Sequence, residues 1–195
     1  MALDADAGPM LSYSLDYESK WWLPVPSRFP TETDDDVAGW ARRVAATSPT
    51  QAPWNEEPWS GFVPQQLEQQ FAELDPDRAA ALWYCPYGVP AAGYVQLFAL
   101  AREGDVDLMA ELDGLTSLVA VRPGAVRANG LGEGVAYSRI LGDDEGNATV
   151  AELGYLFAPE GATVAIIARS ADAAVLGMMA PELWELVDTI RVAAR

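Results

Sequence analysis

The 195-residue chain contains no histidine and only one cysteine, Cys85. Without histidine, the chain cannot form a Ser-His or Cys-His nucleophile, a His-based metal cage or an imidazole proton shuttle. One cysteine is too few for Cys-rich zinc sites, iron–sulfur sites or a disulfide framework. Cys85 has no basic residue within six positions, so we interpret it as a small buried hydrophobe. We therefore expect no catalytic residue, no cofactor and no bound metal.

Basic side chains are also scarce. The single lysine, Lys20, and eleven arginines face 29 acidic residues, which gives a net charge of −17. The excess is evenly spread, with a net charge of −9 over residues 1–98 (5 basic, 14 acidic) and −8 over residues 99–195 (7 basic, 15 acidic). Such a surface opposes direct binding to nucleic acid or to an anionic membrane.

The chain shows no signal for export or membrane insertion. Residues 1–6, Met-Ala-Leu-Asp-Ala-Asp, have neither the basic nor the apolar region of a signal peptide. No apolar run approaches the roughly 18 residues that a membrane-spanning helix needs. We expect a cytoplasmic protein without a membrane span.

Residues 21–90 are rich in proline and aromatic rings. They contain ten of the fourteen prolines and six of the seven tryptophans, namely Trp21, Trp22, Trp40, Trp54, Trp59 and Trp83. Because proline fixes φ and lacks an amide donor, we expect short elements and irregular connections here. The pattern predicts extended segments over 10–17, 20–25 and 82–85 and a loop over 47–63. It also predicts a helix capped by Thr33 and a second helix with Pro64 in its first turn. The apolar stripes of these helices are Val37, Trp40, Ala41 and Val44 in the first and Leu67, Phe71 and Leu74 in the second.

The residues after Gly93 have a more regular pattern. They predict strands over 94–101, 115–121, 135–141, 149–157 and 163–168, with a short helix over 105–112. A last helix is expected to begin at Pro181 and to bury Leu183, Val187 and Ile190. Connections as short as those between the last three strands allow only antiparallel pairing.

These elements predict an α+β fold in which an antiparallel sheet of about five to seven strands is flanked by helices. We expect one domain over residues 1–195. In it, the Trp/Pro-rich part, 1–90, wraps a part of strands and a helix, 91–195, because the helix stripes of the first part need an apolar surface to cover.

The C-terminal strands and helix over residues 115–193 resemble the Mog1/PsbP-like group, which includes DcrB-type and LpqN-type proteins. The resemblance rests on the order of these elements and on the ending Pro181-Glu-Leu-Trp-Glu-Leu-Val-Asp-Thr-Ile-Arg-Val192. It covers about 40% of the chain and implies an antiparallel sandwich on a non-catalytic accessory, adaptor or chaperone protein. That group has no shared catalytic motif, so the resemblance implies no active-site residue. The lipobox cysteine of its lipoprotein members is missing here.

Two pairs of tryptophans are the candidate partner-binding residues. Trp54 and Trp59 lie in a Pro-rich loop, where their indoles can insert into a partner or cover the core of the loop. Trp21 and Trp22 point to opposite faces of an extended segment, so one ring can be exposed while the other packs in the core.

Other polar clusters have simpler interpretations. We interpret Asp34-Asp35-Asp36 as a helix N-terminus and Asp143-Asp144-Glu145 as a hairpin turn, because neither has the spacing of a calcium loop. The glycine-rich segment 130–134 leads into a strand and carries Glu133, which argues against a nucleotide phosphate site.

The leading hypothesis is a non-enzymatic binding module, an adaptor, chaperone or accessory protein, that contacts another protein through its aromatic N-terminal surface. A second hypothesis is an acidic nucleic-acid mimic that occupies a DNA- or RNA-binding protein. A third is a carboxylate-dependent hydrolase, which needs two facing acids in a cleft and a raised pKa. A carrier of a small apolar ligand is a variant of the first and needs a large apolar cavity.

Overall fold

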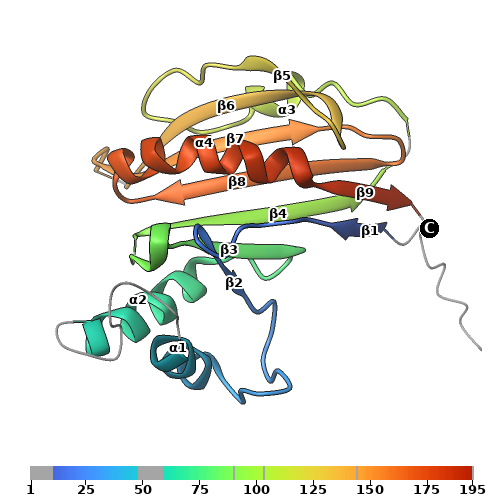
Figure 1. Ribbon diagram of the computed structural model, residues 1–195. Helices are drawn as coiled ribbons and strands as arrows, with labels where there is room; N and C mark the ends of the chain where they lie inside the picture. The colour runs from blue at the N-terminus through green and yellow to red at the C-terminus, as the bar shows by residue number, and fades with distance from the viewer. Residues whose placement is uncertain (1–10, 48–58, 90, 103, 144, 195) are drawn as a thin grey trace, which may run out of the picture.

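A computed structural model describes residues 11–47, 59–89, 91–102, 104–143 and 145–194 (Figure 1). The side chains of residues 47, 59, 60 and 194 lie outside this description. The elements in chain order are β1 (Leu11–Ser14), β2 (Trp22–Val25), α1 (Val37–Thr47), α2 (Trp59–Glu73), β3 (Ala80–Tyr84), the 3-10 turn η1 (Pro86–Gly88), β4 (Gly93–Ala101), α3 (Ala110–Asp113), β5 (Gly124–Ala128), β6 (Gly132–Gly142), β7 (Ala148–Phe157), β8 (Ala162–Ser170), α4 (Ala173–Thr189) and β9 (Arg191–Ala194).

Seven of the strands form one antiparallel sheet in the order β2-β3-β4-β8-β7-β6-β5. The predicted antiparallel α+β architecture is confirmed. β2 and β3 come from the Trp/Pro-rich part and lie in the same sheet as the later strands. β1 and β9 pair antiparallel in a separate two-stranded sheet, so residues near both ends of the described chain lie side by side (Figure 1).

Helix α4 covers one face of the large sheet. Alternate residues of a strand point to the same face, and Val164, Ile166 and Ala168 of β8 share one buried cluster with α4. Leu183 and Val187 of α4, and Ile190 directly after its last residue, are buried in that cluster. The stripe that the sequence predicts for the last helix is therefore confirmed.

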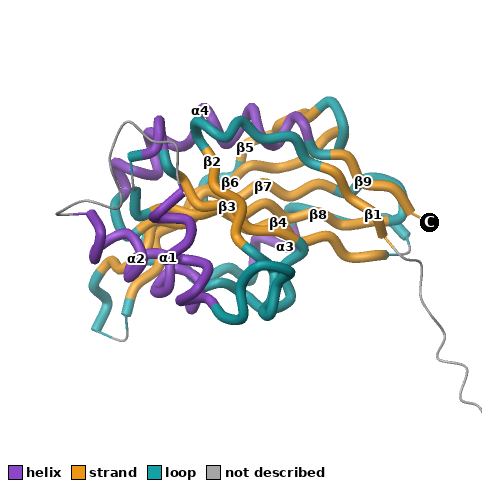
Figure 2. Tube along the Cα trace, turned by 60° about the horizontal axis from the view of Figure 1, so that its bottom comes forward, coloured by secondary structure: helices purple, strands orange, loops and turns teal. Residues whose placement is uncertain are grey.

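Helices α1 and α2 pack together over the opposite face of β3, at one end of the sheet (Figure 2). Trp40 of α1 and Leu67 of α2 share a buried cluster with Trp83 and Cys85. Cys85 is 4% exposed, and its burial raises the pKa of the thiol to about 12. The interpretation of Cys85 as a small buried hydrophobe is confirmed.

The predicted starts of three helices are wrong. Asp36, rather than Thr33, caps α1, because its Oδ1 accepts the Gly39 amide at 2.7 Å. Helix α4 begins eight residues before Pro181, where Asp172 Oδ1 accepts the Ala174 amide at 2.8 Å. Pro181 and Pro64 each lie inside a helix rather than in its first turn. Trp59 opens α2, so the predicted loop over 47–63 is shorter at its C-terminal end.

The predicted strand over residues 115–121 is also wrong. This segment is irregular, and the strand in this region is β5, which begins at Gly124. Leu115 and Val121 pack against a small cluster around Leu112 and Tyr137, so their apolar character reflects packing rather than strand pairing. The predicted helix over 105–112 shortens to α3.

Candidate functional site

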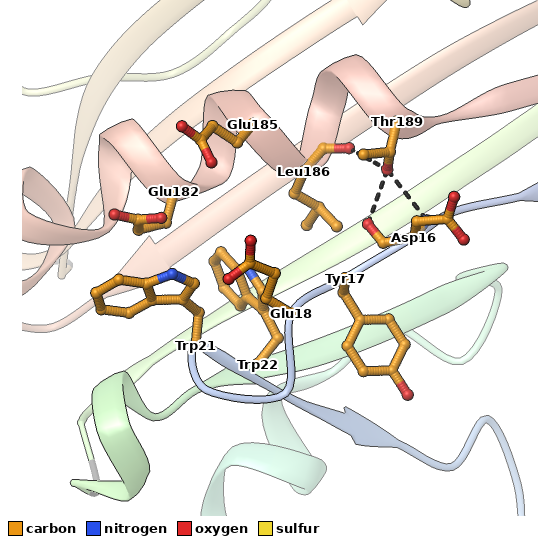
Figure 3. A pocket seen from close by; sticks show the side chains of 9 residues that line it. All are labelled: Asp16, Tyr17, Glu18, Trp21, Trp22, Glu182, Glu185, Leu186 and Thr189. Atoms are coloured by element: carbon orange, nitrogen blue, oxygen red, sulfur yellow. Dashed lines mark hydrogen bonds between the residues drawn. The ribbon is translucent and has the colours of Figure 1, made fainter.

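A groove of about 330 Å³ lies between the connection from β1 to β2 and helix α4 (Figure 3). We call it the β1–α4 groove. Its lining residues are Asp16, Tyr17, Glu18, Trp21, Trp22, Glu182, Glu185, Leu186 and Thr189. The groove thus combines the Trp21-Trp22 segment with a helix that lies about 160 residues further along the chain.

The helical wall of the groove follows from the repeat of α4. Glu182, Glu185, Leu186 and Thr189 are spaced at i, i+3, i+4 and i+7, which places them on one face of the helix. Leu186 is buried, whereas Glu185 is exposed. This face presents two carboxylates above an apolar base.

Backbone hydrogen bonds hold the other wall in place. The Thr189 hydroxyl lies 2.8 Å from the carbonyl oxygen of Asp16 and accepts the Asp16 amide at 3.1 Å (Figure 3). The amides of Trp21 and Trp22 both donate to the Glu18 carbonyl, at 2.9 and 3.1 Å, which forms a tight turn. The Cys85 amide donates to the Trp21 carbonyl at 2.8 Å. The segment is therefore anchored to both α4 and the end of β3.

The two indoles have different environments. Trp22 is 3% exposed and its ring lies 5.3 Å from that of Tyr84, so it belongs to the main core. Trp21 is half-buried and packs edge-to-face on Tyr87, with ring centroids 4.7 Å apart. Figure 3 shows both rings on the side of the groove opposite α4. Trp21 is the indole of this pair that a ligand can reach.

The groove is strongly acidic, and Lys20 lies beside it. Its charged lining residues are Asp16, Glu18, Glu182 and Glu185. Lys20 lies next to them, with its Nζ 2.5 Å from Glu18 Oε2 and 5.5 Å from the centroid of the Trp21 ring. The hydrogen bond with Glu18 raises the pKa of Lys20. An ammonium group thus already rests against this indole and one of the carboxylates.

Of the two candidate pairs, the described structure brings together only Trp21 and Trp22. Trp21 and Trp22 line the β1–α4 groove. Trp54 lies outside the described residues, and Trp59 is described only as the first residue of α2. The sequence did not indicate that Glu182 and Glu185 of α4 belong to a site, because their positions are typical of the solvent-facing side of an amphipathic helix.

The described residues of the two acidic runs have structural roles: Asp36 caps α1, and Asp143 lies in the hairpin between β6 and β7. Asp34 pairs with Arg43 at 2.6 Å, and this hydrogen-bonded guanidinium lowers the pKa of Asp34. Asp143 accepts hydrogen bonds from the side chain and backbone of Asn147 in the hairpin between β6 and β7, which lowers the pKa of Asp143. Within the described ranges, no group of three or more cysteine, aspartate or glutamate residues is placed to hold a metal ion.

The glycine-rich segment 130–134 packs against the end of α4. A Cβ on Gly130 would lie 2.1 Å from the Ile190 carbonyl oxygen, so this close approach requires glycine. Asp188 Oδ1 accepts the Asn129 amide at 2.7 Å. The segment includes the end of the β5–β6 connection and the start of β6, and it supports the end of α4.

One buried charge was not foreseen from the sequence. Glu152 on β7 is fully buried and accepts hydrogen bonds from Arg139 Nε at 2.5 Å, Arg169 Nε at 2.8 Å and the Tyr137 hydroxyl at 2.9 Å. Burial alone would raise the pKa of Glu152, but the bonds from both arginines outweigh burial and leave the pKa lowered. Glu152 is therefore an ionised cross-strand link rather than a proton donor.

The fold and the groove define an antiparallel α+β protein with an acidic, aromatic surface groove. None of the helices in the described residues is long and apolar enough to cross a membrane. Comparison with known protein families and with curated protein sequences finds no match.

Among solved structures, the chain is similar to LpqN, a protein involved in cell envelope biogenesis of Mycobacterium tuberculosis. The identity is 12%, and the similarity covers 97% of this chain and 87% of that chain, with a TM-score of 0.38. This level of similarity does not show that the two proteins belong to one family. The Mog1/PsbP-like resemblance therefore stays a prediction.

Proposed function

We propose that this protein is a non-enzymatic binding module, acting as an adaptor, chaperone or accessory protein, and that the β1–α4 groove is part of its contact surface. The observation that carries the proposal is the position of Trp21. Its half-buried indole lines a groove whose walls are held by hydrogen bonds to α4 and β3. A pre-positioned aromatic ring at the edge of a groove is typical of residues that anchor protein contacts.

Two buried groups, Glu152 and Cys85, are poorly suited to acid–base or nucleophilic chemistry. Glu152 is ionised and fully paired with two arginines, and the Cys85 thiol has a raised pKa. A hydrolase would need a carboxyl group with a raised pKa facing a second acid, which is the opposite of the state of Glu152. An apolar void near Leu15 and Ile190 has a volume of about 10 Å³, far below what a lipid would fill. These observations favour a surface that binds over one that reacts.

Affinity capture with a matched pair of variants tests the proposal. The tagged wild type, Trp21→Ala and Leu100→Ala are incubated with lysate of the host and washed at about 0.1 M salt. Leu100 is 65% exposed on β4 and does not line the groove, so it controls for the loss of an exposed apolar side chain. We expect Trp21→Ala to reduce retention of a partner by about tenfold or more and Leu100→Ala to retain it.

Two outcomes would contradict the proposal. One is equal retention of the same proteins by the wild type and Trp21→Ala. The other is no protein retained by the wild type above a tag-only control. A nucleic-acid mimic would give the first outcome, because its partner is held by charges spread over the surface, and its complex would be lost from both proteins at about 0.5 M salt.

A further inference from the structure

We infer that the β1–α4 groove binds a basic side chain of a partner polypeptide, with arginine preferred, whose positive charge faces Glu182 and Glu185 and whose flat surface lies on Trp21. This inference rests on the proposed function and specifies the chemistry of the ligand.

Charge complementarity is the first argument. The four charged residues that line the groove are all acidic, and its remaining lining residues are neutral. Carboxylates from two separate walls, Asp16 and Glu18 on the connection and Glu182 and Glu185 on α4, surround the same hollow. Such an arrangement attracts a cation, repels an anion and becomes more favourable when a positive group enters.

Lys20 supplies the second argument, because it shows that this wall holds a cation. Its ammonium group lies within the roughly 6 Å at which an aromatic ring attracts a cation, and it also pairs with Glu18. The side chain of Lys20 is 50% exposed, and an exposed pair of this kind adds little stability. A ligand cation can therefore displace Lys20 at small cost.

The size of the hollow favours an organic cation. Across the described residues, the carboxylates are not grouped closely enough to hold a metal ion, although four of them line a groove of about 330 Å³. A guanidinium group fits this arrangement better than an ammonium group, because it is planar, stacks on indoles and directs five N–H donors to separate carboxylates. We therefore commit to an arginine-containing segment as the occupant.

Peptide binding tests the inference with a defined probe. A short acetylated peptide of alternating glycine and arginine is titrated by calorimetry into the intact protein, beside a peptide in which neutral citrulline replaces arginine. We expect the wild type to bind the arginine peptide about tenfold more tightly than the citrulline peptide. Equal affinity for the two peptides, or no detectable binding of the arginine peptide, would overturn the inference.

A charge-matched pair of variants locates the binding. Glu182→Gln/Glu185→Gln removes two carboxylates from the groove, whereas Glu133→Gln/Glu160→Gln removes two exposed carboxylates that do not line it. We expect the first variant to lose about tenfold in affinity and the second to change by less than about twofold. Equal losses would mean that the peptide responds to overall charge and not to the groove. Thermal unfolding of each variant checks that the fold is retained.

The variant Lys20→Gln tests whether the ligand replaces the internal cation. We expect it to bind the arginine peptide about threefold more tightly than Arg127→Gln, which also removes one exposed cation but lies on β5. If the two variants bind alike, the ligand and Lys20 do not share a site.

The outcomes separate this inference from the proposed function. Suppose that Trp21→Ala loses its partner but the wild type binds the two peptides equally. The groove is then supported as a contact surface, and the inference that it binds arginine is rejected.

Discussion

Glu152 illustrates how a residue with an ordinary sequence signal can become a buried, ionised group in the folded protein. Glu152 lies on the face of β7 opposite Leu153 and Tyr155, and nothing in the sequence of β7 indicates that its carboxylate is buried. In the structure, Arg139 and Arg169 come from the two neighbouring strands and enclose it. Glu152 is buried because of the residues on the two strands that pair with β7. The sequence of β7 alone does not reveal which strands these are.

Replacing Glu152 by glutamine should destabilise the fold strongly. The change leaves two largely buried arginines without a counter-charge, so we expect a loss of about 3 kcal/mol in the free energy of unfolding at pH 7, measured with urea. The control Glu133→Gln breaks an exposed pair with Arg127 and should cost less than about 1 kcal/mol. Equal losses for the two variants would show that the buried cluster does not support the fold.

The loss of unfolding free energy caused by Glu152→Gln should depend on pH in a defined direction. The pKa of Glu152 in the folded state lies below its ordinary value of 4.5. The stabilisation from the ionised carboxylate is therefore complete above about pH 4.5 and is lost as the pH falls through the folded-state pKa. The difference in unfolding free energy between the wild type and Glu152→Gln should narrow below that pH. A difference that stays constant as the pH falls to about 3 would contradict the assignment.

At the scale of elements, apolar stripes were more informative than prolines. The stripes of α1 and α4 identify their buried faces, because a repeat of 3.6 residues fixes which side chains share a face. Pro64 and Pro181 resemble first-turn prolines, yet both lie inside helices. Asp172 caps α4 and is followed by small and apolar residues that form no polar face. Without a polar face, the sequence pattern does not reveal that the first two turns of α4 are helical.

A pair of threonine variants tests how α4 is joined to the wall of the groove. Thr189→Val removes the hydroxyl that bonds the backbone of Asp16, so we expect a loss of about 1 kcal/mol in unfolding free energy and weaker binding of the arginine peptide. Thr163 has a buried hydroxyl with no hydrogen-bond partner among the described residues. Thr163→Val should be neutral or stabilising for that reason. A reversed order of the two stabilities would contradict this account of the wall.

For the whole molecule, the sequence predicted the class of fold but not the site. Short connections between β6, β7 and β8 permit only antiparallel pairing, so the core of the sheet could be inferred locally. The β1–α4 groove joins residues 16–22 to residues 182–189, and the pairing of β1 with β9 brings those segments together. Contacts of such long sequence separation have no signature in either segment alone. The acidic charge is spread evenly along the sequence, and only the structure shows that carboxylates from both segments line the same groove as Trp21.

Photo-crosslinking from the wall of the groove would test the central claim most directly. A photoreactive phenylalanine analogue replaces Tyr17, which is 41% exposed and lines the groove, and a second protein carries it in place of Leu100. After irradiation in the host, we expect position 17 to form a covalent adduct with a partner protein and position 100 to form none. An adduct from position 100 alone, or no adduct from position 17, would contradict the assignment of the β1–α4 groove as the contact surface.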